Sequence, residues 1–300
     1  LMFSPGGDRL AYGAWTDSNL RVVVDDRPGR PLLGVASMFF DHAGNLFYVA
    51  HDRFGMVFVG NEVVLGRHAA IAWPTVSREG GRWAYAASDG GPWFAVENGQ
   101  FDPPYPQVRD LAFEPGYGRF AYVAGDDTEE ILIVDGRAGR SWKKLVESVF
   151  NSEGGHLGYI ARTDTMAVVV IDGNAVGVHE EADDLIFNGR GDRYAYMGTD
   201  DRLMAVYHDQ GAHPFPILIG GSLVFSSDGD HWGCLAGDPG RRRLFLAVDG
   251  SETDVLFDWA GFSSSVTAQL DSIIAGTGGM NLVRDWVRAE MHLWLEAYPH

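Results

Sequence analysis

The 300 residues of this chain are enough for one large domain or for two of ordinary size. Hydrophobic residues make up 46% and charged residues 21%, a composition that excludes a disordered chain. The formal net charge of −18 repels phosphate backbones and anionic headgroups, so we expect no nucleic-acid partner and no membrane insertion.

One segment recurs along almost the whole sequence. Each copy contains a bulky apolar residue, a turn with glycine, and a short run that carries tyrosine or, once, cysteine. The copies begin, at spacings of 36 to 38 residues, at Phe3, Phe40, Val76, Phe113, Phe150, Phe187 and Phe225. So constant a period predicts a repeat architecture.

Each copy predicts four strands. The first ends at the bulky apolar residue, and the second alternates large and small side chains with a period of two. The third is apolar, as in Leu20–Val24, Ile131–Val134, Val168–Ile171 and Leu244–Val248. An Asp-Gly turn then leads to a short, more polar outer strand. Four strands in so few residues are typical of a propeller blade, so we predict an all-β fold, a seven-bladed β-propeller of four-stranded antiparallel blades.

The repeats divide the chain into two parts. Residues 1–260 would form the propeller, and residues 261–300 a closing strand and a C-terminal helical extension packed on it. The apolar positions Val283, Trp286, Val287, Met291, Trp294 and Tyr298 follow a helical period. Because Phe262 is in register with an eighth copy, eight blades with a degenerate last one remain the alternative.

The segments SPGGDRLAY, from Ser4, and SSDGDHWGC, from Ser226, resemble the WD40-like or TolB-like propeller repeat, with its S-P-D-G-x-x-L-A-Y/F signature. The Trp-Asp dipeptide and the Gly-His pair of WD40 blades do not recur. The resemblance implies a propeller that binds proteins or small ligands, or one that gates an α/β-hydrolase domain. It implies a fold more than a function.

Motifs for catalysis are weak. The sequence has no G-x-S-x-G nucleophile elbow, and its ten histidines show no zinc-site spacing. A single cysteine, Cys234, excludes an internal disulfide, and its apolar surroundings predict an inert core thiol. We expect no cofactor, and calcium is the one ion that we consider. We expect a soluble protein, without assigning it to the periplasm or the cytoplasm.

An aspartate follows the second strand of every copy. These residues are Asp17, Asp52, Asp89, Asp126, Asp164, Asp200 and Asp238. Because the loops should emerge on one face of a propeller, they form an acidic loop face. Two interpretations remain open: turn chemistry, since aspartate caps its own backbone in tight turns, and a site for a cation or a basic partner.

A second set lies three residues before each strand-ending residue. We predict that it lines the mouth of the central channel and binds a ligand. Its members are Ser37, Trp73, Asp110, Glu147, Asp184, Ser222 and Trp259. Adjacent carboxylates would favour a cation or an amine, and the indole faces would stack on a ligand. The alternative is that the carboxylates are merely solvated and the tryptophans pack between blades.

These patterns favour a non-catalytic binding or scaffold propeller. It would engage a protein partner, or a small cationic or neutral ligand, at the acidic loop face and the channel mouth. One alternative is a carbohydrate-active hydrolase or lyase that uses two channel carboxylates as acid and base. Another is a structural subunit of a larger complex. A catalytic acid would have a raised pKa in a closed pocket, whereas binding carboxylates would be open and ionised.

Overall fold

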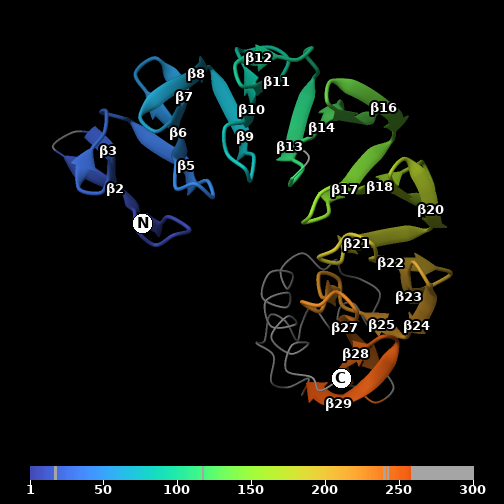
Figure 1. Ribbon diagram of the computed structural model, residues 1–300. Helices are drawn as coiled ribbons and strands as arrows, with labels where there is room; N and C mark the ends of the chain where they lie inside the picture. The colour runs from blue at the N-terminus through green and yellow to red at the C-terminus, as the bar shows by residue number, and fades with distance from the viewer. Residues whose placement is uncertain (17–18, 117, 239–240, 242, 258–300) are drawn as a thin grey trace. The chain divides into compact units, whose positions relative to one another are not determined.

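A computed structural model describes residues 1–16, 19–116, 118–238, 241 and 243–257. Within these ranges the regular elements are all strands (Figure 1). The predicted closing strand near Phe262, the C-terminal helix and the whole 261–300 extension lie outside the described residues, as do Asp17 and Trp259. The chain divides into two compact units, with the boundary after Lys143.

The first unit consists of four-stranded sheets that follow one another along the chain. Their strands are β1 (Met2–Phe3), β2 (Leu10–Thr16), β3 (Asn19–Val24) and β4 (Arg27–Pro28); β5 (Gly34–Phe40), β6 (Leu46–Asp52), β7 (Gly55–Gly60) and β8 (Val63–His68); β9 (Ala70–Val76), β10 (Trp83–Ser88), β11 (Phe94–Glu97) and β12 (Gln100–Phe101); and β13 (Gln107–Phe113), β14 (Phe120–Gly125), β15 (Glu130–Val134) and β16 (Arg137–Trp142).

The second unit continues the pattern. Its strands are β17 (Lys144–Phe150), β18 (Leu157–Arg162), β19 (Ala167–Ile171) and β20 (Asn174–His179); β21 (Glu181–Phe187), β22 (Tyr194–Asp200), β23 (Leu203–His208) and β24 (Gly211–Phe215); and β25 (Ile217–Leu218), β26 (Val224–Phe225), β27 (Trp232–Asp238), β28 (Arg243–Val248) and β29 (Ser251–Phe257). In the last sheet the first strand is interrupted, so β25 and β26 both pair with β27.

The repeat boundaries predicted from the sequence are confirmed. In every described sheet the first strand ends at the predicted apolar residue, from Phe3 in β1 to Phe225 in β26. Neighbouring strands are antiparallel and paired in chain order, so the polar fourth strand lies at the outer edge. Each sheet therefore has two ends. The turn end holds the turns from first to second and from third to fourth strand, and the loop end holds the loops from second to third strand and the links to the next sheet.

The Asp-Gly turns owe their sequence to backbone geometry. Asp172 and Gly173 have φ of 50° and 80°, the left-handed pair that a tight hairpin turn requires. The Asp172 carboxylate also accepts a hydrogen bond from the Leu157 N–H, at 2.9 Å, and so fixes the start of the second strand. In other sheets the side chain at the equivalent turn position accepts the same hydrogen bond from the first N–H of the second strand. These residues are Asp25, Asn61, Asn98, Asp135 and Asp249.

The core lies between successive sheets. Tyr85 of β10 is 1% exposed and packs against Phe58 of the preceding sheet, with ring centroids 5.1 Å apart. Its neighbours Ala84 and Ala86 point the other way and pack with Tyr122 of the following sheet. The predicted alternation of large and small side chains thus serves two interfaces, and burying each such ring contributes roughly 1.5–3 kcal/mol. Cys234 occupies the same position in the last sheet and is fully buried; burial raises the pKa of its thiol, as expected of an inert core residue.

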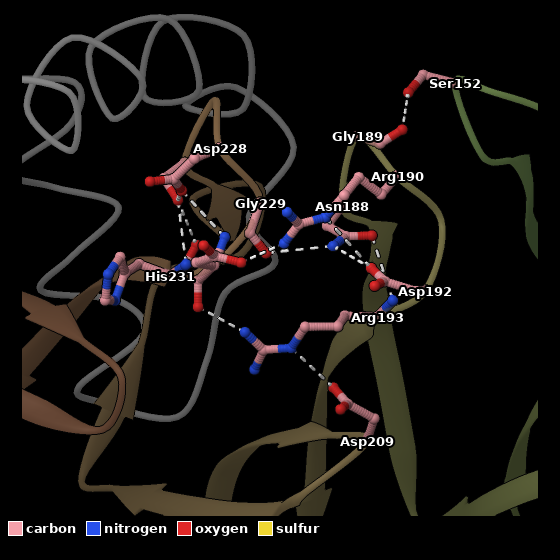
Figure 2. Close-up of polar contacts among 12 residues, drawn as sticks. Ser152, Asn188, Gly189, Arg190, Asp192, Arg193, Asp209, Asp228, Gly229 and His231 are labelled. Carbon is pink, nitrogen blue, oxygen red and sulfur yellow. Dashed lines mark hydrogen bonds and ion pairs between the residues drawn. The ribbon is translucent and has the colours of Figure 1, made fainter.

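At the turn end, cationic or imidazole side chains connect several pairs of consecutive sheets within each unit. Arg193 of the β21–β22 turn donates Nη1 to the Asp230 carbonyl at 2.6 Å, and its Nε lies 3.4 Å from Asp209 (Figure 2). Its guanidinium also covers the ring of Phe225, at 5.7 Å. Equivalent contacts between consecutive copies are Arg9 over Phe40, Arg82 over Phe113 and His156 stacked on Phe187. In these four pairs, the strand-ending phenylalanine therefore packs against a side chain from the turn of the preceding sheet.

Candidate functional site

The described residues among those predicted to line the channel mouth lie where the first strand is irregular. Register shifts occur in β5, β9, β13, β17 and β21 next to the predicted residue, and Ser222 lies in the break between β25 and β26. Trp73, Asp110 and Asp184 have φ of 51°, 54° and 60°. Bulges with left-handed backbone redirect side chains and are common beside functional sites.

In the first unit these positions are open to solvent. Trp73 is 50% exposed, and Ser37 is half-buried. Asp110, whose side chain is 35% exposed, forms an ion pair with Arg109, which also binds Glu130 at 2.7 Å. The exposed Trp73 indole argues against the interpretation that this tryptophan packs between blades.

In the second unit the carboxylates link neighbouring sheets. Asp184 is fully buried, and its Oδ2 accepts a hydrogen bond from the Leu223 N–H of the next sheet at 3.1 Å. Glu147 Oε2 accepts from the Leu185 N–H, again one sheet further on, at 3.3 Å. Ser222 is also fully buried, and its Oγ accepts from the Leu235 N–H at 3.0 Å. Asp184 and Ser222 are therefore structural acceptors, and the interpretation of solvated carboxylates does not describe Asp184.

Asp52 and Asp126, two of the loop-end aspartates, show turn chemistry, one of the two interpretations of this set. Asp52 accepts from the Phe54 N–H at 2.8 Å and binds both terminal nitrogens of Arg67, at 2.5 and 2.7 Å. The hydrogen bond from Arg67 lowers the pKa of Asp52 to about 2. Asp126 accepts from the Thr128 hydroxyl and backbone N–H, which lower the pKa of its carboxyl. These carboxylates are therefore ionised at neutral pH while they order the loops.

The sequence interpretation missed two hydrogen-bonded Asp–His–Tyr chains at the loop end, which we call relays. In the second unit His179 Nδ1 lies 2.7 Å from Asp200 Oδ2, and its Nε2 lies 3.1 Å from the Tyr196 hydroxyl. In the first unit His68 lies 3.1 Å from Asp89 and 3.4 Å from the Tyr85 hydroxyl, an arrangement with the same sequence spacings. Both relays join the end of one sheet to the loop of the next.

The relays have the acid–base order of a catalytic triad but end in the wrong group. The hydroxyl at the end belongs to a tyrosine that is 1% or 2% exposed, so no substrate reaches it. Such a chain instead satisfies a buried phenol and orients the imidazole. Matching spacings of 17 and 4 residues in His68–Tyr85–Asp89 and His179–Tyr196–Asp200 were the available signal.

Large apolar side chains are exposed beside these acidic loops. In the first unit Trp15 is 69%, Phe54 67% and Leu33 60% exposed, and all three lie at the loop end of the first two sheets. Arg53 and Arg67 lie 4.5 and 5.3 Å from the Phe54 ring centroid. In the second unit Leu203, the first residue of β23 at the loop end, is 70% exposed. The loop end thus combines ionised carboxylates with accessible apolar groups.

Two features are absent from the described residues. In those residues no group of three or more His, Cys, Asp or Glu side chains could hold a metal ion. The same part of the chain contains no helix long and apolar enough to span a membrane.

Comparisons with known proteins support the fold. No protein-family model matches the sequence, and no curated protein matches it. Among solved structures, a eukaryotic initiation factor aligns with a TM-score of 0.52 at 11% identity, over 86% of this chain and 78% of that one. The Dos1 propeller gives 0.44 at 10% identity, over 85% and 83% of the two chains. TolB from Acinetobacter baumannii gives 0.36 at 11% identity, over 69% and 64%. With its four-stranded antiparallel sheets, the chain is similar to β-propellers of the WD40 and TolB type.

Proposed function

We propose that this chain is a seven-bladed, non-catalytic propeller that binds a basic protein partner through the loop end of its sheets. The observation that carries the proposal is the combination of ionised aspartates and exposed aromatic side chains at the loop end. Ionised aspartates held by turn hydrogen bonds lie at the same end of the sheets as the side chains of Trp15 and Phe54, which are about two-thirds exposed. Aromatic residues supply most of the energy in protein interfaces, and surrounding charges set the choice of partner and the association rate.

The charge state of the loop carboxyls supports binding rather than acid catalysis. The hydrogen bond from His68 lowers the pKa of Asp89, as the one from Arg67 lowers that of Asp52. A general acid needs the opposite shift, toward a protonated carboxyl at neutral pH. We further propose that Trp73 and Asp110, on the first strands of two sheets in the first unit, contact a partner or small ligand, where calcium would be the candidate ion.

Site-specific photo-crosslinking tests the proposal. A benzophenone amino acid is placed at Phe54 or, as a matched control, at Phe101, which is 65% exposed on the outer strand β12. We expect a discrete cross-linked partner from Phe54 and none from Phe101.

Binding of the purified partner then provides the quantitative check. Phe54→Ala should weaken it by roughly tenfold or more, and added salt should weaken it further. Val63→Ala, at the turn end, should have no effect. Equal cross-linking from both positions, or binding that does not change in Phe54→Ala, would contradict the proposal.

A further inference from the structure

A cavity of about 510 Å³ lies between the first two sheets, at their turn end. Residues Arg9, Asp25, Arg27 and Gly29 line it from the β1–β4 sheet, and the β5–β8 sheet contributes Leu46 and Glu62. These are the blue sheets near the N-terminus in Figure 1. The volume falls within the range of roughly 300–1,000 Å³ that is typical of small-molecule sites.

The last two sheets show what fills the equivalent space. There His208 of β23, His213 of β24 and Trp232 of β27 form an aromatic cluster, with ring centroids 5.3 to 5.7 Å apart. The imidazole of His213 lies directly over Gly250: a Cβ added there would be 2.0 Å from His213 Nδ1. Strand pairing identifies the counterparts in the first two sheets.

At these positions the first two sheets lack the three aromatic rings and have one carboxylate instead. The counterparts are Val24 for His208, Gly29 for His213, Leu46 for Trp232 and Glu62 for Gly250. Glu62 reaches over Gly29, since a Cβ on this glycine would lie 2.5 Å from Glu62 Oε2. The cavity thus results from particular substitutions at positions that another pair of sheets uses for packing.

Charged groups around the cavity retain unused hydrogen-bonding capacity. Arg27 has no hydrogen bond or ion pair to any described residue. Arg9 donates Nε to Asp25 at 3.0 Å and Nη1 to the Gly44 carbonyl at 2.6 Å, so its Nη2 has no partner among the described residues. Glu62 Oε1 accepts from the Tyr48 hydroxyl at 3.2 Å, and Oε2 has no such partner in the described part of the chain.

The uncharged polar groups, by contrast, bind one another. Asn61 Nδ2 donates to Asn45 Oδ1 at 2.8 Å, Asn61 Oδ1 accepts from the Leu46 N–H, and Asn45 Nδ2 donates to Asp41. Both oxygens of the Asp25 carboxylate already accept hydrogen bonds, from Arg9 Nε and the Leu10 N–H. A ligand is therefore selected by two guanidinium groups, the Glu62 carboxylate and the apolar wall of Val24, Pro28 and Leu46.

We propose that this cavity binds a small zwitterion with an apolar substituent, in the class of free amino acids and dipeptides. The ligand carboxylate would bind Arg27 and Arg9 Nη2, and its ammonium would bind Glu62 Oε2. Guanidinium–carboxylate pairs suit this role because the fork of donors matches the planar acceptor. The site is at the opposite end of the sheets from the proposed protein interface, so the two proposals can fail independently.

Calorimetric titration of the whole chain tests the proposal with defined probes. They are the apolar amino acids represented by L-leucine, the dipeptide leucyl-glycine, 4-methylpentanoate, which lacks the ammonium, and 3-methylbutylamine, which lacks the carboxylate. We expect saturable binding of a zwitterion, with each single-charge analogue at least tenfold weaker, since each analogue loses one set of charge-assisted hydrogen bonds.

Variants locate the site. Arg27→Gln and Glu62→Gln should each weaken zwitterion binding about tenfold or more. The double variant Gly29→His with Glu62→Gly copies His213 and Gly250, and it should abolish binding while its urea unfolding midpoint shows that it folds. Arg137→Gln, on the exposed strand β16, is the matched control and should bind as the parent does.

Two results would overturn the assignment. If no zwitterion binds at about 10 mM, or if binding persists in the filled double variant, the cavity is not a site for this class. If 4-methylpentanoate binds as tightly as leucine and Glu62→Gln has no effect, the cavity binds simple anions instead.

Discussion

Replacing His179 with leucine removes the imidazole that joins Asp200 to Tyr196. Leucine has a similar volume, so the effect comes from polar groups rather than from a cavity. The Tyr196 hydroxyl, on a side chain that is 2% exposed, would lose its partner, at a cost of about 1–3 kcal/mol. The pair with Asp200, whose side chain is 41% exposed, adds at most about 1 kcal/mol. We therefore expect His179→Leu to lower the free energy of unfolding by about 1–4 kcal/mol.

Urea unfolding followed by circular dichroism measures this loss. His156→Leu is the matched control, because the His156–Asp172 pair is 44% and 37% exposed and should cost less than about 1 kcal/mol. Adding Tyr196→Phe to His179→Leu removes the orphaned hydroxyl and should restore about 1–2 kcal/mol. Equal losses from the two histidine variants, or no recovery in the double variant, would refute the proposed role of the buried phenol.

Three further predictions concern the fold. Asp184→Ala should destabilise the chain by about 1–3 kcal/mol in urea, because it removes a buried acceptor for a backbone N–H of the next sheet. Gly66→Ala should cost about 1–3 kcal/mol by thermal unfolding, since its Cβ would lie 1.8 Å from the Tyr85 hydroxyl. Asp52→Asn should remove a pH-dependent contribution. The folded-state pKa of Asp52 is lowered to about 2, so its stabilisation is complete above pH 4 and is lost as the pH falls toward 2; at this exposed pair it amounts to about 1 kcal/mol.

Each of these three predictions has a protein for comparison and an outcome that would contradict it. Ser37→Ala, at the bulge equivalent to Asp184, should change stability by less than about 0.5 kcal/mol. Gly34→Ala, where an added Cβ meets nothing within 4 Å, should be neutral. An Asp184→Ala protein as stable as the parent, a harmless Gly66→Ala, or parent and Asp52→Asn stabilities that fall in parallel below pH 4 would each contradict the corresponding argument.

The sequence predicted those features that depend on a single copy of the repeat. Phe40 and Phe113 mark strand ends because the apolar alternation stops there, and Asp172-Gly173 marks a hairpin because few other pairs adopt two left-handed conformations. Strand order followed from the same local signals, since each short turn joins neighbouring antiparallel strands.

Features that depend on two copies were not predictable in this way. His179 belongs to the fourth strand of one copy and Asp200 to a loop of the next, so neither is conspicuous in its own segment. The burial of Asp184 depends on a bulge whose register the sequence does not reveal. The cavity depends on Gly29, which is unremarkable until compared with His213 in another pair of sheets.

The contacts of guanidinium and imidazole groups with phenylalanine rings at the turn end have a consequence for how the number of repeat copies can change in evolution. Each contact takes its cation from one copy and its ring from the following copy. The copy that begins at Phe187 brings both, since its Phe187 ring stacks on His156 and its Arg193 covers Phe225. A tandem duplication of residues 187–224 would therefore introduce a new cation for the ring downstream and a new ring for the imidazole upstream. Because no partner is left without a match at either junction, unequal crossing-over within the gene could change the number of copies without first having to create a new interface.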